Sequence, residues 1–160
     1  MGVGITDILE RKTISIADLK RKTLAVDAFN QLYMFITTIR GYDCSVLTDS
    51  KGRTTSHLVG LFSRLTNLMS QGLKLVYVFD GKVPDLKHKE LEKRKEAKMK
   101  AQKEYDASKE KEDVDTMRKF AGRTARLTGE MVAEAKQLLD CLGVPWVQAE
   151  SEGEAQATHM

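Results

Sequence analysis

The chain has few of the features that mark several common protein classes. It contains only two cysteines, with no Cys-x-x-Cys pair and no His/Cys cluster, which argues against a zinc finger or a disulfide framework. No apolar run approaches the roughly 20 residues that span a bilayer, and the N-terminus has no signal-peptide pattern. We therefore expect an intracellular protein from a reducing compartment, without a membrane partner.

The charged residues are unevenly distributed along a chain that is about one domain long. They make up 31% of 160 residues, yet the formal net charge is only +3. Residues 82–103 hold nine Lys/Arg against four Asp/Glu, whereas residues 104–115 hold two Lys against six Asp/Glu. A run so poor in large apolar residues is typical of a solvated helix or a mobile segment, and its basic half favours a surface that faces phosphate.

Hydrophobic patterning predicts strands that alternate with helices. Three short apolar runs are predicted strands, and the near-continuous run at 74–79 is typical of a central parallel strand; the other two lie at 23–27 and 144–147. Apolar residues at helical spacing predict helices over 28–40 with Gly41 as its cap, from the Thr-Thr-Ser caps at 54–56 to Gly72, over 130–142, and from near Ser151. This order predicts an α/β fold with parallel crossovers.

Acidic residues follow each of the three predicted strands, as Asp27, Asp80, and the pair Glu152 and Glu154. Ligands of open α/β sheets bind outside the carboxyl ends of the strands, and clustered carboxylates suit a hard cation such as Mg²⁺. Each position also has a structural interpretation. Asp27 could cap the next helix, Asp80 could belong to an Asp-Gly turn, and Ser151 with Glu154 has the spacing of a capping box.

Several motifs, taken in this order, resemble those of the flap endonucleases of the structure-specific 5′ nuclease superfamily, with the archaeal members the nearest match. They are Val26-Asp27-Ala28, Thr54-Thr55-Ser56-His57-Leu58, Val76-Tyr77-Val78-Phe79-Asp80-Gly81-Lys82 and Glu152-Gly153-Glu154-Ala155-Gln156-Ala157. The resemblance implies a PIN-like, mainly parallel sheet flanked by helices. It divides the chain into an N-terminal nuclease region (1–84), a charged helical gateway or cap insertion (85–130), and the start of an internal nuclease region (131–160).

The resemblance also implies an activity and its cofactor. The family removes 5′ flaps from DNA during replication and repair, using two Mg²⁺ ions for which Mn²⁺ can substitute. Asp27, Asp80, Glu152 and Glu154 match its metal ligands. The family's remaining ligands and its tail for the sliding clamp lie further along than Met160, so the resemblance implies an N-terminal fragment, cytoplasmic if archaeal, whose partner is branched or flap DNA.

Further residues acquire roles through the same resemblance. Lys87 and Arg94 match basic residues that act on the scissile phosphate, and Tyr33 matches an aromatic residue that stacks on a base. Its spacing on an apolar helical stripe, taken alone, favours a core aromatic for Tyr33. Candidate DNA contacts are Arg40, Arg64, Arg123 and Arg126. Arg40 and Arg64 are candidates through their charge alone, and solvated surface is the favoured role for each. His57 is expected to be structural.

Three functional interpretations remain open from the sequence. The first is a metal-dependent 5′ flap endonuclease or 5′–3′ exonuclease, present as a fragment or as half of a split enzyme. The second is a module that holds branched DNA without hydrolysing it. The third is a PIN-like ribonuclease, which the long charged insertion after Asp80 disfavours.

Overall fold

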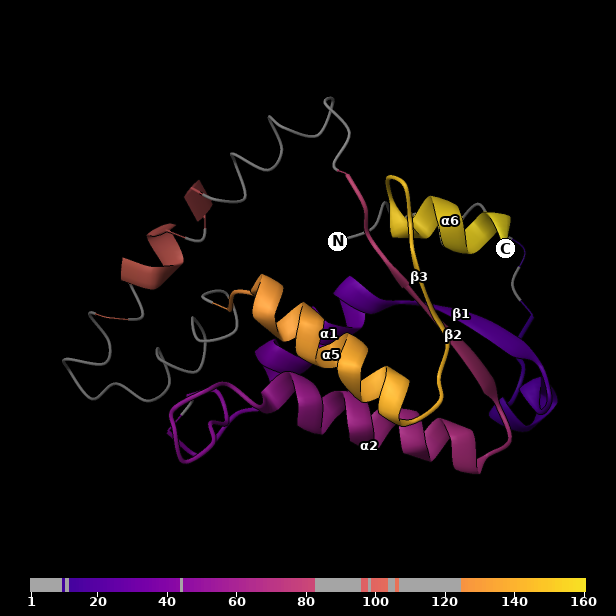
Figure 1. The fold of residues 1–160 in the computed structure, drawn as a ribbon, viewed down its shortest axis with the longest axis horizontal. Helices are drawn as coiled ribbons and strands as arrows, with labels where there is room; N and C mark the ends of the chain where they lie inside the picture. The colour runs from indigo at the N-terminus through magenta and orange to yellow at the C-terminus, as the bar shows by residue number, and fades with distance from the viewer. Residues whose placement is uncertain are drawn as a thin grey trace.

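The computed structural model describes residues 10, 12–43, 45–82, 96–97, 99–103, 106 and 125–160. They contain a parallel three-stranded sheet in the order β1-β2-β3 (Figure 1), so the predicted α/β class and the central position of residues 74–79 are confirmed. The strands are β1 (Thr23–Asp27), β2 (Lys74–Phe79) and β3 (Trp146–Gln148). The helices whose bounds the structure defines are a 3-10 helix (Ile16–Leu19), α1 (Ala28–Thr38), α2 (Ser56–Ser70), α5 (Gly129–Cys141) and α6 (Gly153–His159).

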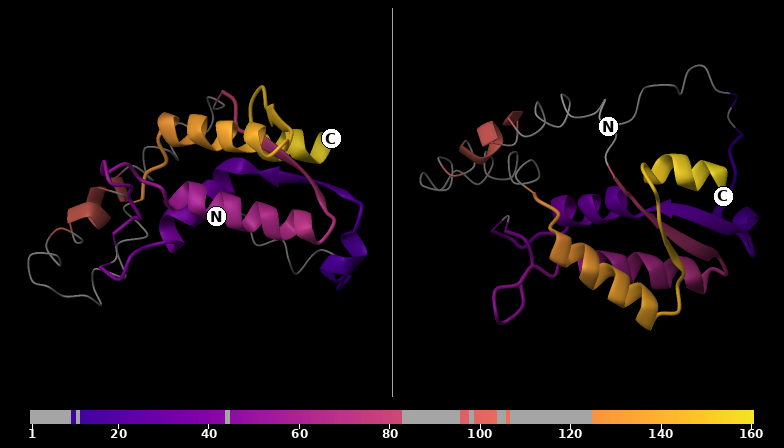
Figure 2. Two further views of the ribbon diagram at one scale, coloured as in Figure 1. Left: turned by 60° about the horizontal axis from the view of Figure 1, so that its bottom comes forward. Right: turned by 45° about the horizontal axis from the view of Figure 1, so that its top comes forward.

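Side chains of β2 alternate between the two faces of the sheet. Tyr77 and Phe79 are buried in one cluster with residues of α1, α2 and α5, and Val78 is buried on the opposite face. Helix α6 contacts β1 and β2 and lies on the other side of the sheet from α2 (Figures 1 and 2). The sheet is therefore covered on both faces, as its near-continuous apolar central strand predicts. No helix within these described ranges is long and apolar enough to cross a membrane.

Two predicted boundaries were wrong for identifiable reasons. The third strand begins at Trp146 rather than residue 144, because Pro145 has no N–H for the ladder and offers only its carbonyl, which accepts from Tyr77 N–H at 3.0 Å. The first helix ends at Thr38, and Gly41 does not cap it. Ile39 adopts extended backbone, and Arg40 then pairs with Val46 in an isolated antiparallel bridge.

The start of α2 uses its polar residues differently from the prediction. Thr55 occupies the N-cap position but makes no side-chain capping bond. The buried Ser56 hydroxyl instead accepts the Leu47 N–H at 2.8 Å and donates to the Ile39 carbonyl at 2.8 Å. Tertiary hydrogen bonding has thus replaced local capping, and it fixes both ends of the loop between α1 and α2.

His57, expected to be structural, is fully buried and joins two helices. Its Nε2 lies 3.0 Å from Glu134 Oε2 on α5, while its buried Nδ1 has no hydrogen-bond partner within the described part of the chain. Burial lowers the pKa of His57 below its usual 6.5, and the nearby Glu134 carboxylate partly opposes that shift. The folded protein therefore favours the neutral imidazole.

The His57 shift predicts a loss of stability in mild acid. Above about pH 6.5 both folded and unfolded His57 are neutral; below it the unfolded chain binds a proton first, so stability falls until the lower folded pKa is passed. Urea unfolding between about pH 7.5 and 5.5 should show a steeper decline for the wild type than for His57→Gln, which does not titrate. Parallel pH profiles for the two proteins would contradict this role.

Candidate metal centre and basic pocket

The predicted acidic residues follow the ends of parallel strands, so they lie toward one edge of the sheet. Asp27 is the last residue of β1 and pairs in register with Val78 of β2. Asp80 follows Val78 by two residues and lies just after the end of β2. After β3 ends at Gln148, four residues lead to α6, which begins at Gly153. The parallel topology is the reason that residues distant in sequence approach one another here.

Asp27 caps the helix that follows it. Its Oδ1 accepts the Asn30 N–H at 2.9 Å, and its backbone is extended, as is usual at an N-cap. One carboxylate oxygen of Asp27 therefore caps the helix, as its structural interpretation predicted. Such a cap contributes about 1 kcal/mol and does not conflict with a second role, because a carboxylate has two oxygens with about four lone-pair sites.

Asp80 is linked directly to the start of α6. Its Oδ1 accepts the Gly153 N–H at 2.7 Å, and a Cβ built on Gly153 would lie only 2.7 Å from that same oxygen. A side chain at position 153 would therefore push Asp80 away. Glu152 directly precedes this glycine, so the hydrogen bond brings the backbone of one acidic segment against the carboxylate of another.

The capping-box interpretation of Ser151 and Glu154 does not hold. Helix α6 begins at Gly153 with Glu152 as its N-cap, the Glu152 side chain makes no capping hydrogen bond, and Glu154 lies exposed in the first turn. The Ser151 hydroxyl donates instead to the Lys82 carbonyl at 3.3 Å. The backbone explains this difference, because the Gly81 N–H donates to the Ser151 carbonyl at 2.6 Å and holds that segment beside the end of β2.

The chemistry of this edge suits a divalent cation, although the ligand geometry is incomplete. Carboxylate oxygens are the ligands that Mg²⁺ prefers, and the edge supplies them from three separate segments. Among the residues that the structure describes, however, no three Asp, Glu, His or Cys side chains are arranged to hold one metal ion. The described carboxylates therefore supply suitable donor atoms but do not by themselves form a metal-binding site.

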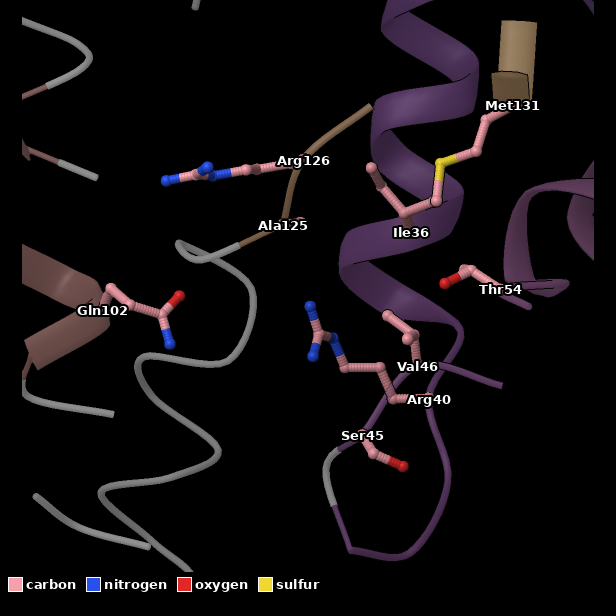
Figure 3. Close-up of a pocket in the computed structure, with 9 residues that line it drawn as sticks. All are labelled: Ile36, Arg40, Ser45, Val46, Thr54, Gln102, Ala125, Arg126 and Met131. Carbon is pink, nitrogen blue, oxygen red and sulfur yellow. The ribbon is translucent and has the colours of Figure 1, made fainter. Parts of the chain in front are cut away.

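A second feature is a pocket of about 600 Å³ beside the end of α1. The ends of the Arg40, Gln102 and Arg126 side chains lie around the same opening (Figure 3). The Arg40 Nε donates to the Thr37 carbonyl at 3.2 Å, which leads the side chain back along α1. The apolar part of the wall is formed by Ile36, Val46 and Met131. The pocket thus brings together two arginines that the sequence predicted as DNA contacts, with apolar surface beside them.

The structure gives less support for a role of the other predicted site residues. Tyr33 is half-buried on α1 and lies outside the buried core cluster. Arg64 is exposed on α2, near enough to Tyr77 to oppose the burial that raises the pKa of that phenol to about 12. The remaining predicted positions fall outside the described residues: Lys87, Arg94, Arg123 and most of the insertion at 85–130.

Three residues near the acidic edge were missed by sequence reasoning. Gln148 ends β3 and contacts the backbone of Asp80, Lys136 on α5 contacts Gln148, and Gly81 packs against the segment before α6. A polar residue closing an apolar strand was the available signal for Gln148. Nothing in the helical pattern of α5 marked Lys136, because lysines are common on amphipathic helices.

Comparisons with family models, curated proteins and solved structures agree on one family. Residues 1–101 match the XPG N-terminal domain. Flap endonuclease 1 of Hyperthermus butylicus is 53% identical over 163 residues, covering 100% of this chain and 47% of that protein. The chain therefore spans about half the length of the curated relatives it matches.

Solved structures show the same likeness. Flap endonuclease-1 of Methanococcus jannaschii aligns with a TM-score of 0.69 and 42% identity over 99% of this chain and 50% of that one. Human GEN1, solved in complex with Holliday junction DNA, aligns with a TM-score of 0.60 and 27% identity over 99% of this chain and 34% of that one. On the match of its first 101 residues, supported by these relatives, the chain belongs to the XPG N-terminal domain family.

Proposed function

We propose that this chain carries the N-terminal part of the active site of a structure-specific 5′ flap endonuclease, a metal-dependent hydrolase of DNA phosphodiesters. The observation that carries the proposal is the acidic edge, where carboxylates follow all three parallel strands and Asp80 is hydrogen-bonded to the first residue of α6, beside Glu152. The name of the Hyperthermus butylicus relative supports the same activity.

The proposed roles follow from the chemistry of the residues. Asp27, Asp80, Glu152 and Glu154 would contribute to holding the divalent ions, with further ligands supplied elsewhere in the complete enzyme. Bound Mg²⁺ ions supply an activated water and stabilise charge on the phosphate. The Gly153 N–H, 2.7 Å from Asp80 Oδ1, orients that carboxylate. Lys87 and Arg94 would stabilise negative charge on the phosphate.

The pocket beside α1 supports binding of the DNA backbone. Guanidinium groups match phosphate geometry and stay charged at all physiological pH values, and Arg40 and Arg126 both line this pocket. Arg64 and Arg123 would add phosphate contacts, and a half-buried aromatic such as Tyr33 can stack on a base for about 1–3 kcal/mol. The human GEN1 structure, a complex with Holliday junction DNA, supports branched DNA as the ligand class.

A second candidate is a module that binds branched DNA without cutting it. It is favoured by one specific finding, that the residues with described positions contain no group of three metal-ligating side chains. The chain covers 47% of its relative's length. The fold of this part is compatible with either candidate function. They differ in whether a second half restores hydrolysis.

Cleavage of a labelled 5′-flap DNA in Mg²⁺ distinguishes these candidates. The chain is assayed alone and together with the second half of the Hyperthermus butylicus relative. We expect cleavage at the flap junction only when the second half is present, because that half would supply the further ligands proposed above. Tight flap binding with no cleavage in either case would favour the binding module, and preference for RNA over DNA would favour a ribonuclease.

A further inference from the structure

The Gln148 side chain links helix α5 to two backbone carbonyls at the end of β2. Its Nε2 donates to the carbonyl of Asp80 and, at 3.4 Å, to the carbonyl of Phe79. Its Oε1 accepts from Lys136 Nζ at 2.8 Å. One side-chain amide therefore spans three elements: α5, the end of β3, and the end of β2.

The donors and acceptors of this network permit only one orientation of the Gln148 amide. A lysine ammonium can only donate, and a backbone carbonyl can only accept. If the amide were flipped, its NH₂ would face Lys136 and its oxygen would face the Asp80 carbonyl, so both sets of hydrogen bonds would be lost. Lys136 thus reinforces the orientation in which the NH₂ group faces the Asp80 carbonyl.

The Lys136 ammonium is itself held in place by aromatic rings. Its Nζ lies 4.3 Å from the ring centroid of Trp146 and 4.9 Å from that of Phe79. The two rings meet edge to face with centroids 5.8 Å apart, and the Trp146 indole N–H donates to Asp140 Oδ1 at 2.8 Å. Cation–π attraction at this range is worth about 0.5–2 kcal/mol, enough to favour one position of an otherwise flexible side chain.

We propose that Lys136 and Gln148 form a positioning relay for Asp80. Lys136 orients the Gln148 amide, the amide holds the Asp80 carbonyl, and the Gly153 N–H holds Asp80 Oδ1 at 2.7 Å. Asp80 is thereby fixed at both its backbone and its carboxylate. The inference rests on the proposed metal-binding role of Asp80 and assigns a function to two residues that do not touch metal or DNA themselves.

The relay is tested by Mn²⁺ binding, measured by calorimetry on the 160-residue chain together with the second half of the Hyperthermus butylicus relative. Lys136→Met keeps the apolar stem over the two rings but removes the donor, and Gln148→Leu removes the amide. Each is expected to weaken Mn²⁺ binding about tenfold or more, as is usual when a partner of a metal ligand is lost. Lys136→Arg, which retains a cationic donor, should restore most of the affinity.

Two comparisons separate positioning from general stability. The double variant Lys136→Met/Gln148→Leu should bind Mn²⁺ no more weakly than Gln148→Leu alone, because both changes break one chain of contacts. As matched controls, Lys74→Met and Gln71→Leu make the same chemical changes at exposed positions on or before β2. Both controls should bind Mn²⁺ like the wild type. Additive losses in the double variant, or equal losses in the controls, would overturn the relay.

The failure of the relay can be told from the failure of the proposed function. If Asp80→Asn removes Mn²⁺ binding while Lys136→Met leaves it unchanged, the metal site stands and the relay is overturned. If the wild type together with that second half shows no Asp80-dependent Mn²⁺ binding, the proposed function fails, and the relay is then tested by NMR alone. Lys136→Met should then shift the Gln148 side-chain amide signals and speed their hydrogen exchange; unchanged signals would refute it.

Discussion

Replacing Asp80 with asparagine is expected to abolish Mn²⁺ binding at the acidic edge and flap cleavage by the completed enzyme, with little loss of stability. Asparagine retains an oxygen that can accept the Gly153 N–H, now 2.7 Å from Asp80 Oδ1, so the backbone link to α6 survives. It loses the negative charge that a hard cation requires. Because metal ions supply several kcal/mol of transition-state stabilisation, the rate should fall by roughly 10³-fold or more.

Asp140→Asn provides a matched control for this change. Asp140 lies on α5, and its Oδ1 accepts the Trp146 indole N–H at 2.8 Å, an acceptor role that asparagine can also fill. The two variants thus lose the same charge and keep the same kind of hydrogen bond at different places. Urea unfolding should give free energies within about 0.5 kcal/mol of the wild type for both. Retained cleavage in Asp80→Asn, measured on the same flap DNA, would remove Asp80 from the set of metal ligands.

The sequence was most informative where one physical signal dominated. The apolar run of β2 has no competing pattern, and its two ends, its central place and the position of Asp80 after it were all predictable. Parallel strands then require that Asp27 and Asp80 lie at the same edge. Fold class and the approximate location of the candidate site followed from these few residues.

Local signals failed where a tertiary hydrogen bond competed with them. Ser56 and Ser151 both stand where a capping serine is expected, yet each hydroxyl bonds a partner distant in sequence. The segment before α6 is held by backbone bonds from Gly81, so α6 begins after Glu152 rather than at a capping box. The Lys136–Gln148 pair is likewise invisible to spacing rules, because it depends on how α5 crosses the end of the sheet.

The second large effect is expected at Gly81, where lack of space excludes any side chain. A Cβ built there would lie 2.0 Å from the Ala149 carbonyl oxygen and 2.7 Å from the Glu150 carbonyl carbon. Backbone atoms cannot rotate away as a flexible side chain can, so Gly81→Ala must separate the end of β2 from residues 149–151. We expect the free energy of unfolding to fall by about 3 kcal/mol, from overpacking of about 1–3 kcal/mol and weakened backbone hydrogen bonds of about 1 kcal/mol each.

Gly129→Ala is the matched control, because a Cβ at Gly129, the first residue of α5, meets nothing within 4 Å. Alanine favours a helix, so that variant should be neutral or more stable by about 0.5–1 kcal/mol. Urea unfolding and Mn²⁺ titration of both variants check the expectation. Gly81→Ala should lose stability and Mn²⁺ affinity together, because the Gly81 N–H holds the Ser151 carbonyl at 2.6 Å and thereby sets where Glu152 and Gly153 approach Asp80. If Gly81→Ala were as stable as Gly129→Ala, the end of β2 and residues 149–151 could separate without cost. The acidic edge would then lack the rigid backbone on which a preorganised metal site depends.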